Sequence, residues 1–166
     1  MATPQQKLMP LLSEEEYLAF ERQAEERHIY IDGRIQAMAG ESFAHGRISM
    51  NLARELGIAL KGKPCEPLSK DMKVRSGSAQ AKTKWPPKGF FSYPDIVIVC
   101  GPISHDEHED VVVNPKVIIE VLSASTEAFD RGEKFQRYRR HNDTLSDYIV
   151  NRAGQTLRGA FYPAAG

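Results

Sequence analysis

Two short apolar runs constrain the fold more than any other feature of the sequence. Residues 96–100 (IVIVC) and 117–122 (VIIEVL) are almost continuously hydrophobic and rich in β-branched side chains. Strands that are buried on both faces have this composition, whereas strands with one face in water alternate polar and apolar residues. We therefore expect the two runs to form the centre of a sheet that is covered on both sides.

The rest of the chain predicts helices and strands in a mixed order around this pair. Apolar spacing and turn residues indicate a helix over 13–27, a hairpin over 28–38, a helix over 42–60, a half-buried strand over 68–75, a helix from about 126 or 130 to 141, and a strand over 145–150. The dipeptide Asp32-Gly33 in the hairpin supplies the positive φ angles of a type I′ turn. Because the strand at 145–150 follows a helix, we expect it to lie parallel to residues 117–122.

Length and composition are typical of one globular domain. The chain has 166 residues, of which 41% are hydrophobic and 27% are charged. The 22 basic and 22 acidic residues cancel, so binding to nucleic acid would depend on local patches rather than on net charge. We interpret the chain as a single domain over 1–166, with a core at about 42–150 and an irregular tail at 151–166.

The N-terminus and the cysteines indicate the cellular compartment. The first residues lack a charged start followed by a long apolar stretch, and the longest apolar run is far shorter than the ~18 residues of a membrane span. We therefore expect a cytoplasmic protein with no membrane partner. Cys65 and Cys100 form no CxxC motif, and we expect both to be reduced, buried thiols.

Two carboxylates break the hydrophobic pattern of the central strands. Glu120 lies inside the second apolar run, where an ionised group is costly without a cation, a metal or hydrogen bonds. Asp95 follows Pro94 and opens the first run. If the strands pair antiparallel, the beginning of one lies beside the end of the other, so Asp95 and Glu120 converge. The alternative is that Glu120 forms an internal ion pair with Arg75 or Lys134.

Converging carboxylates are typical of a site for a hard divalent cation. Mg²⁺ takes oxygen ligands from one or two carboxylates and keeps several waters. Such a cation polarises a phosphoryl oxygen and lowers the pKa of a bound water, which is the metal-assisted route to phosphodiester hydrolysis. A nearby lysine would stabilise the developing negative charge, and Lys134 and Lys73 are the candidates.

Four segments carry a resemblance to a known family. They are IDGRIQAMAGESFAHGRI, KDMKVR, YPDIVIVC and NPKVIIEVLSASTEAFDRGEKFQRYRR. Over about residues 14–150 the chain resembles the Uma-two family of putative restriction endonucleases, and its element order looks like the core of the PD-(D/E)XK nuclease superfamily. The resemblance implies an α/β fold with a restriction-endonuclease-like core, in which helices flank a mixed central sheet (helix, three antiparallel strands, helix, strand). An N-terminal helix and β-hairpin precede this core.

The resemblance also implies metal-dependent cleavage of DNA. Asp95 and Glu120 would hold Mg²⁺, or Mn²⁺, and act with a catalytic lysine. The superfamily places that lysine two positions after the glutamate, where this chain has Leu122, so the family pattern points to Lys134 on the following helix. Supporting roles fall to four residues, which are His45, Asp71, Lys73 and Tyr138.

A basic segment indicates where DNA would bind. Residues 61–88 hold eight Lys or Arg against two acidic residues, and they include a long loop. Lysines in such a loop suit phosphates, and aromatic rings suit bases. The candidate contacts are Lys82, Lys84, Trp85 and Lys88. Phe90 and Phe91 would either stack on bases or pack onto the core, and Asp71 and Lys73 also fit the solvated face of a strand.

These observations favour a metal-dependent endonuclease that acts on DNA. Cutting both strands of a duplex requires two active sites, so we expect a homodimer. The alternative is a catalytically silent nuclease-fold protein that binds nucleic acid or a protein partner. A third interpretation is a scaffold in which Glu120 only pairs internally.

Overall fold

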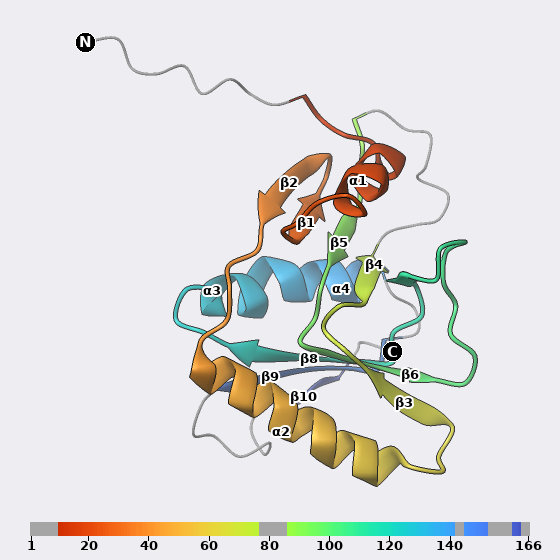
Figure 1. Cartoon of the computed structure of the whole chain (residues 1–166), viewed down its shortest axis with the longest axis vertical. Coiled ribbons are helices and arrows are strands. Elements are labelled where there is room, and N and C mark those ends of the chain that lie inside the picture. The colour runs from red at the N-terminus through yellow and green to blue at the C-terminus, as the bar shows by residue number, and fades with distance from the viewer. Residues whose placement is uncertain (1–9, 77–85, 142–144, 153–160, 164–166) are drawn as a thin grey trace.

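The structure is a computed structural model that describes residues 10–76, 86–141, 145–152 and 161–163 (Figure 1). Its helices are α1 (Glu14–Glu21), α2 (Phe43–Leu60), α3 (Glu127–Phe129) and α4 (Phe135–His141), with a π-helical turn (Asp130–Lys134) between the last two. Figure 1 shows that the strands form two sheets, with α2 against one side of the lower sheet and with α3 and α4 between the two sheets. None of the helices in the described part of the chain combines the length and hydropathy of a membrane span.

The strands form two five-stranded sheets. The first has the order β2-β1-β5-β4-β7 and contains β1 (His28–Ile31), β2 (Arg34–Ala37), β4 (Lys73–Ser76), β5 (Phe90–Ser92) and β7 (Val111–Val112). The second has the order β10-β9-β8-β6-β3 and contains β3 (Cys65–Leu68), β6 (Ile96–Cys100), β8 (Val117–Leu122), β9 (Asp147–Arg152) and β10 (Phe161–Pro163). The second sheet is mixed, because β8 and β9 are parallel while the other pairs are antiparallel.

The central strands β6 and β8 are buried on both faces, as their composition predicts. They pair antiparallel, with Ile96 opposite Ile119. These two side chains pack with Leu52 of α2, whereas the adjacent residues Val97 and Ile118 pack on the opposite face. Burial of each such side chain stabilises the fold by roughly 1.5–3 kcal/mol. The two faces of this strand pair therefore belong to two separate hydrophobic layers.

The strand after the last helix lies where the crossover pattern predicts. β9 is parallel to β8, with Val150 opposite Glu120. Beyond it, β10 pairs antiparallel with β9, with Phe161 opposite Ile149. The expectation of irregular structure throughout 151–166 is therefore wrong at residues 151–152, which end β9, and at β10. Three residues are too few to display the alternation that identifies a strand in a sequence.

The hairpin and the first helix begin as their local signals predict. Asp32 and Gly33 have φ angles of 47° and 89°, as a type I′ turn requires, and they join β1 to β2. The capping box of α1 is also present, because Ser13 and Glu16 exchange side-chain to backbone hydrogen bonds. The helix is shorter than the predicted 13–27, since the Glu21 carboxylate accepts the backbone N–H of His28 and the chain turns back into β1.

The predicted strand over 68–75 is instead two strands in different sheets. β3 ends at Leu68 and pairs with β6, and β4 begins at Lys73 and pairs with β5. A turn with a hydrogen bond from the Met72 N–H to the Ser69 carbonyl separates them. Two short strands separated by only a turn can give one uninterrupted alternation of polar and apolar residues in the sequence. The first strand of the expected core is therefore β3.

The expectation that Cys65 and Cys100 are reduced is wrong. The antiparallel pairing of β3 and β6 places the two residues directly opposite each other, and they form a disulfide. Their separation of 35 residues gives no hint of this contact. The disulfide does not follow from the sequence, because the predicted strand begins at residue 68 and so excludes Cys65.

Reduction of the Cys65–Cys100 disulfide is expected to lower the free energy of unfolding by about 2–4 kcal/mol. A crosslink that closes a loop of this length restricts the unfolded chain more than the folded one. Urea unfolding with and without a reductant measures the effect. The double variant Cys65→Ser/Cys100→Ser is the control and should not respond to the reductant. Identical wild-type curves under the two conditions contradict the prediction.

Candidate functional site

The pairing of β6 and β8 places Asp95 beside Glu120. Ile96 lies opposite Ile119, so one residue further out along the pair Asp95 lies opposite Glu120. Both carboxylates are on the same face of the sheet as Val97 and Ile118. Asp95 Oδ2 accepts a hydrogen bond of 2.7 Å from the backbone N–H of Val121. The geometric convergence inferred from antiparallel pairing is therefore present in the structure.

Glu120 is buried and has a lysine as its ion partner. Only 2% of the residue is exposed, and its Oε1 lies 2.7 Å from Lys134 Nζ. Burial raises the pKa of Glu120 above its ordinary 4.5, against the opposing effect of the Lys134 charge. Burial alone would lower the pKa of Lys134, but Glu120, Tyr138 and Asp130 together raise it above its ordinary value. Lys134 therefore remains a cation.

A π-helical turn brings Lys134 to this position. Asp130, Lys134 and Tyr138 are all buried, and Lys134 Nζ donates to Asp130 Oδ1 over 3.1 Å. In an α-helix, residues four apart drift by about 40° around the axis with each step. The wider turn at 130–134 reduces this drift, so three residues at a spacing of four can share one face. Such turns are frequent at functional sites.

His45 approaches the site from the start of α2. Its Nε2 lies 3.3 Å from Asp95 Oδ2, and its Nδ1 lies 2.9 Å from Glu41 Oε2. Glu41 also pairs with Lys70. Ser42 caps the helix by accepting the backbone N–H of His45, which holds the imidazole at the first turn. Glu41 is absent from the predicted site residues, although its i,i+4 spacing to His45 is a usable signal.

Tyr138 lies near the site, whereas Lys73 and Asp71 do not. The Tyr138 hydroxyl forms a hydrogen bond with Ser92. Lys73 is buried in β4 and donates to Asp110 over 2.8 Å, and Asp71 is exposed and pairs with Arg27. The proposed solvated strand face is wrong for Lys73, because the charge is paired inside the fold. Lys73 therefore contacts Asp110, whereas Lys134 is the lysine that contacts Glu120.

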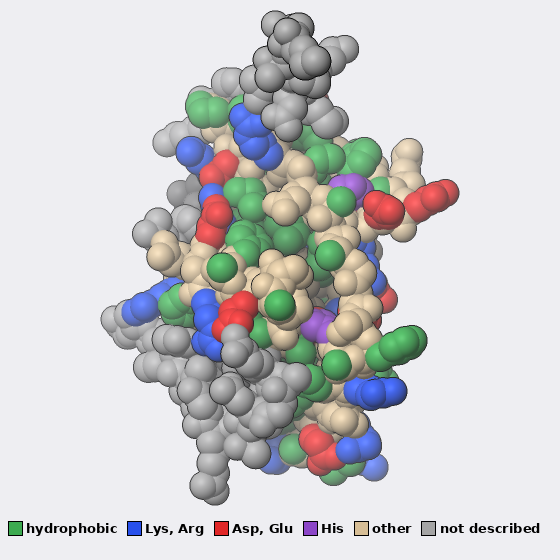
Figure 2. Space-filling model, turned by 90° about the vertical axis from the view of Figure 1, so that its left-hand side faces the viewer, with side chains coloured by type: hydrophobic (Ala, Val, Ile, Leu, Met, Phe, Trp, Pro, Cys, Tyr) green, Lys and Arg blue, Asp and Glu red, His purple; other side chains and the backbone are tan. Residues whose placement is uncertain are grey.

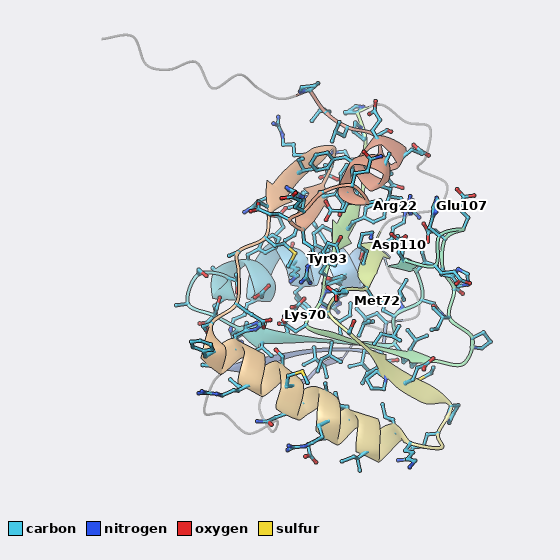
Figure 3. The ribbon with its side chains drawn as sticks, viewed as in Figure 1. Arg22, Lys70, Met72, Tyr93, Glu107 and Asp110 are labelled. Carbon is cyan, nitrogen blue, oxygen red and sulfur yellow. A yellow bond between two sulfur atoms is a disulfide. The ribbon has the colours of Figure 1, made fainter. Side chains whose placement is uncertain are left out.

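The Lys73 ion pair belongs to a network that fastens α1 to the first sheet. Figure 3 shows Arg22 and Asp110 side by side, where the end of α1 meets the loop after β6. Arg22 donates to both carboxylate oxygens of Asp110. Burial alone would raise the pKa of Asp110, but the hydrogen bonds from Arg22 and Lys73 outweigh it and hold that pKa well below its usual range.

The stabilisation that Asp110 contributes is expected to be lost in acid. A carboxylate with a lowered folded pKa stabilises the fold above its ordinary pKa of 3.8, and loses that effect as the pH falls toward the folded value. Urea unfolding of the wild type and Asp110→Asn between pH 6 and 2.5 should therefore show a difference that shrinks below about pH 4. Glu107→Gln, whose side chain is 87% exposed, is the control. A difference that stays constant with pH contradicts the assignment.

The predicted DNA contacts are only partly within the described residues. Lys82, Lys84 and Trp85 lie outside them, and Lys88 is exposed. Phe90 and Phe91 are 1% and 0% exposed, so the interpretation in which they stack on bases is wrong and the packing alternative holds. Figure 2 shows the side of the molecule where α2 begins and β8 ends. Basic and acidic side chains are intermixed on this face.

Comparison with known proteins identifies the family. The model of the Uma2 family, described as "Putative restriction endonuclease", matches residues 14–160. The chain belongs to the Uma2 family.

The chain is also similar to two other sequences and to one solved structure. Two Synechocystis sp. proteins are similar: slr1290 is 38% identical over 141 residues (85% of this chain, 68% of that protein), and sll1609 is 33% identical over 130 residues (78% and 68%). The crystal structure of a "putative nuclease belonging to DUF820" from Anabaena variabilis has a TM-score of 0.66 and 14% identity, covering 89% of this chain and 81% of that chain. The structural similarity confirms the predicted nuclease-like α/β fold.

The donor atoms of this Uma2 chain fit a hard divalent cation. Glu120 Oε1 is buried and accepts no hydrogen bond of good geometry from the described residues, although Lys134 is close. No group of three or more His, Cys, Asp or Glu suited to a metal occurs within the described residues. Mg²⁺ is commonly bound by one or two carboxylates, with waters and a substrate phosphate completing its shell. Asp95 and Glu120 match that requirement.

Proposed function

We propose that this Uma2-family protein is a metal-dependent endonuclease that hydrolyses phosphodiester bonds in DNA. The observation that carries the proposal is the placement of Asp95, the residue before β6, opposite Glu120 of β8, with the Lys134 cation 2.7 Å from Glu120. Two carboxylates and a lysine are the groups that metal-assisted phosphodiester hydrolysis requires. The family assignment supports the same activity.

Each residue has a distinct role in this proposal. Asp95 and Glu120 would hold Mg²⁺, or Mn²⁺, which supplies Lewis-acid polarisation of the phosphoryl oxygen and a lower pKa for an attacking water. Lys134 would stabilise the negative charge that develops on the phosphate oxygens. His45 would orient the Asp95 carboxylate through the contact at Nε2, with Glu41 holding the other ring nitrogen. Asp130 and Tyr138 would keep Lys134 in place.

The assembly proposed for cleavage of a duplex is a homodimer. One copy of the chain has one pair of Asp95 and Glu120, and cutting both strands requires two such pairs. The substrate contacts proposed for the basic loop are Lys82, Lys84, Trp85 and Lys88. These contacts would supply affinity for the phosphate backbone without a base-specific element.

A second candidate function is a catalytically silent module that binds nucleic acid or a protein. The closed pair of Glu120 and Lys134 favours it, since both side chains are less than a tenth exposed and already neutralise each other. Leu122, at the position where the superfamily has its lysine, is buried in the core and supplies no charge.

Plasmid nicking distinguishes the two functions. Supercoiled plasmid is incubated with the protein in Mg²⁺ or Mn²⁺, and in EDTA as the control. Metal-dependent conversion to open-circular or linear DNA supports the endonuclease. Binding of metal or DNA by folded protein, with the plasmid left intact, supports the silent module.

A further inference from the structure

Lys134 lies between two buried carboxylates, and its two contacts differ in kind. Its Nζ donates a hydrogen bond of 3.1 Å to Asp130 Oδ1. Its contact with Glu120 Oε1 is shorter, at 2.7 Å, yet that oxygen accepts no hydrogen bond of good geometry from the described residues. All three side chains are 6% exposed or less. Asp130 therefore holds the ammonium by a directed hydrogen bond, whereas Glu120 holds it by charge.

The acidic groups around Lys134 outnumber it. Asp95 lies opposite Glu120 across the strand pair, and Asp130 shares the Lys134 ammonium. With all three acids ionised and His45 neutral, three negative charges face one positive charge, which leaves two negative charges. Uncompensated charge is costly in a buried site. A divalent cation supplies the two positive charges that this cluster lacks.

A divalent cation at Glu120 competes with Lys134 for the same carboxylate. Lys134 Nζ already lies within ion-pair distance of Glu120 Oε1, and two cations at one oxygen repel each other. Asp130, one helical turn earlier, keeps its hydrogen bond to the ammonium if the contact with Glu120 opens. Lys134 can therefore release Glu120 without leaving the site and without becoming an unpaired charge.

We infer that Lys134 is an exchangeable counterion of Glu120, which it neutralises in the metal-free protein and releases to an incoming divalent cation while it stays on Asp130. This inference rests on the proposed function, because it assigns Glu120 to the metal. It predicts weak metal binding by the protein alone, since the cation has to displace Lys134. The released ammonium has N–H donors for a substrate phosphate. Metal and phosphodiester should therefore strengthen each other's binding, because such coupling is reciprocal.

Replacement of Lys134 tests the competition directly. The affinity for Mn²⁺ is measured by electron paramagnetic resonance of the free ion, in buffer without DNA. Lys134→Met should bind Mn²⁺ about tenfold or more tightly than the wild type, because the competing cation is gone. Arg131→Met makes the same replacement on the outside of the helix and should change the affinity by less than about twofold. Glu120→Gln removes a ligand and should weaken binding by more than about tenfold.

Nuclear magnetic resonance of the wild-type ammonium groups keeps the test independent of how Lys134→Met folds. Lys73 and Lys134 are both 5% exposed, so in protein with ¹⁵N-labelled lysine their ammonium protons are shielded from solvent. Mg²⁺ should shift the Lys134 signal, whose contact with Glu120 opens. Lys73 is the internal control, because its partner is Asp110 and its signal should not move. Lys73→Arg assigns the two signals.

The outcomes separate the inference from the proposed function. Tighter Mn²⁺ binding by Lys134→Met together with a shifted Lys134 signal supports the exchange, even if the protein cleaves no DNA. Metal that binds through Glu120 while the Lys134 signal stays in place overturns the exchange and leaves the endonuclease proposal standing, as does unchanged affinity in folded Lys134→Met. If Lys134→Met does not fold, the wild-type signals alone decide. Absence of any metal binding that depends on Glu120 overturns both.

Discussion

Replacing Asp95 with asparagine is expected to abolish metal-dependent cleavage while the protein stays folded. Removing a residue that only orients a metal ligand lowers metal affinity or activity by about 10- to 100-fold. Loss of a ligand itself should therefore lower the cleavage rate by more than about 100-fold. The asparagine oxygen can still accept the Val121 N–H, which keeps the junction of β6 and β8 intact. Initial rates of plasmid nicking over a range of Mn²⁺ concentrations measure the effect.

Asp71→Asn is the matched control for this prediction. Asp71 is also an aspartate that the sequence placed near the site, but it is exposed and pairs with Arg27. Its loss should leave the cleavage rate unchanged. Circular dichroism and urea unfolding confirm that both variants are folded. If Asp95→Asn cleaves as fast as the wild type, Asp95 does not hold the metal, and the proposed site is wrong.

Replacing Lys134 with methionine is expected to destabilise the protein by about 3–5 kcal/mol. Removal of one partner from a buried ion pair leaves the other charge without compensation, and the low-dielectric interior makes that state costly. Glu120 would have to take up a proton or remain an unpaired anion beside Asp95. Urea unfolding of the variant and the wild type at one pH measures the difference.

Two further variants distinguish the buried pair from a general effect of losing a cation. Arg131→Met removes an ion pair with Glu127 on the outside of the helix. We expect it to lower the free energy of unfolding by less than about 1 kcal/mol. Lys134→Met combined with Glu120→Gln removes both charges and should recover much of the stability lost by Lys134→Met alone. If Lys134→Met and Arg131→Met lower the free energy of unfolding equally, burial does not increase the stabilisation that the Lys134 ion pair contributes.

The features that the sequence predicts well have local causes. The β-branched runs of β6 and β8 require burial on both faces, and Asp32-Gly33 favours one type of turn. The convergence of Asp95 and Glu120 follows from strand direction alone. These inferences need only the residues within an element or the orientation of one pair of strands.

The features that the sequence missed depend on contacts between distant segments. The disulfide arises because β3 and β6 pair in one register, and the sequence does not reveal where β3 begins. Glu41 reaches the site through His45, and the π-helical turn at 130–134 looks like ordinary helix in the sequence. The sequence places Lys73 on a solvated strand face, because nothing local indicates its ion partner Asp110, which is 37 residues away. The roles of Lys82, Lys84 and Trp85 stay predictions.

The position of β8 between two neighbouring strands that are far apart in the sequence affects when the candidate site can become ordered during synthesis. On one side Ile119 meets Ile96, which is made earlier, but on the other side Glu120 meets Val150, which is made 30 residues later. A nascent chain that has just released β8 from the ribosome therefore cannot close the sheet, and pairings of this range form slowly. Lys134 also follows Glu120 in the chain. A partly made polypeptide would therefore lack the ordered arrangement of Asp95, Glu120 and Lys134 until β9 has left the ribosome.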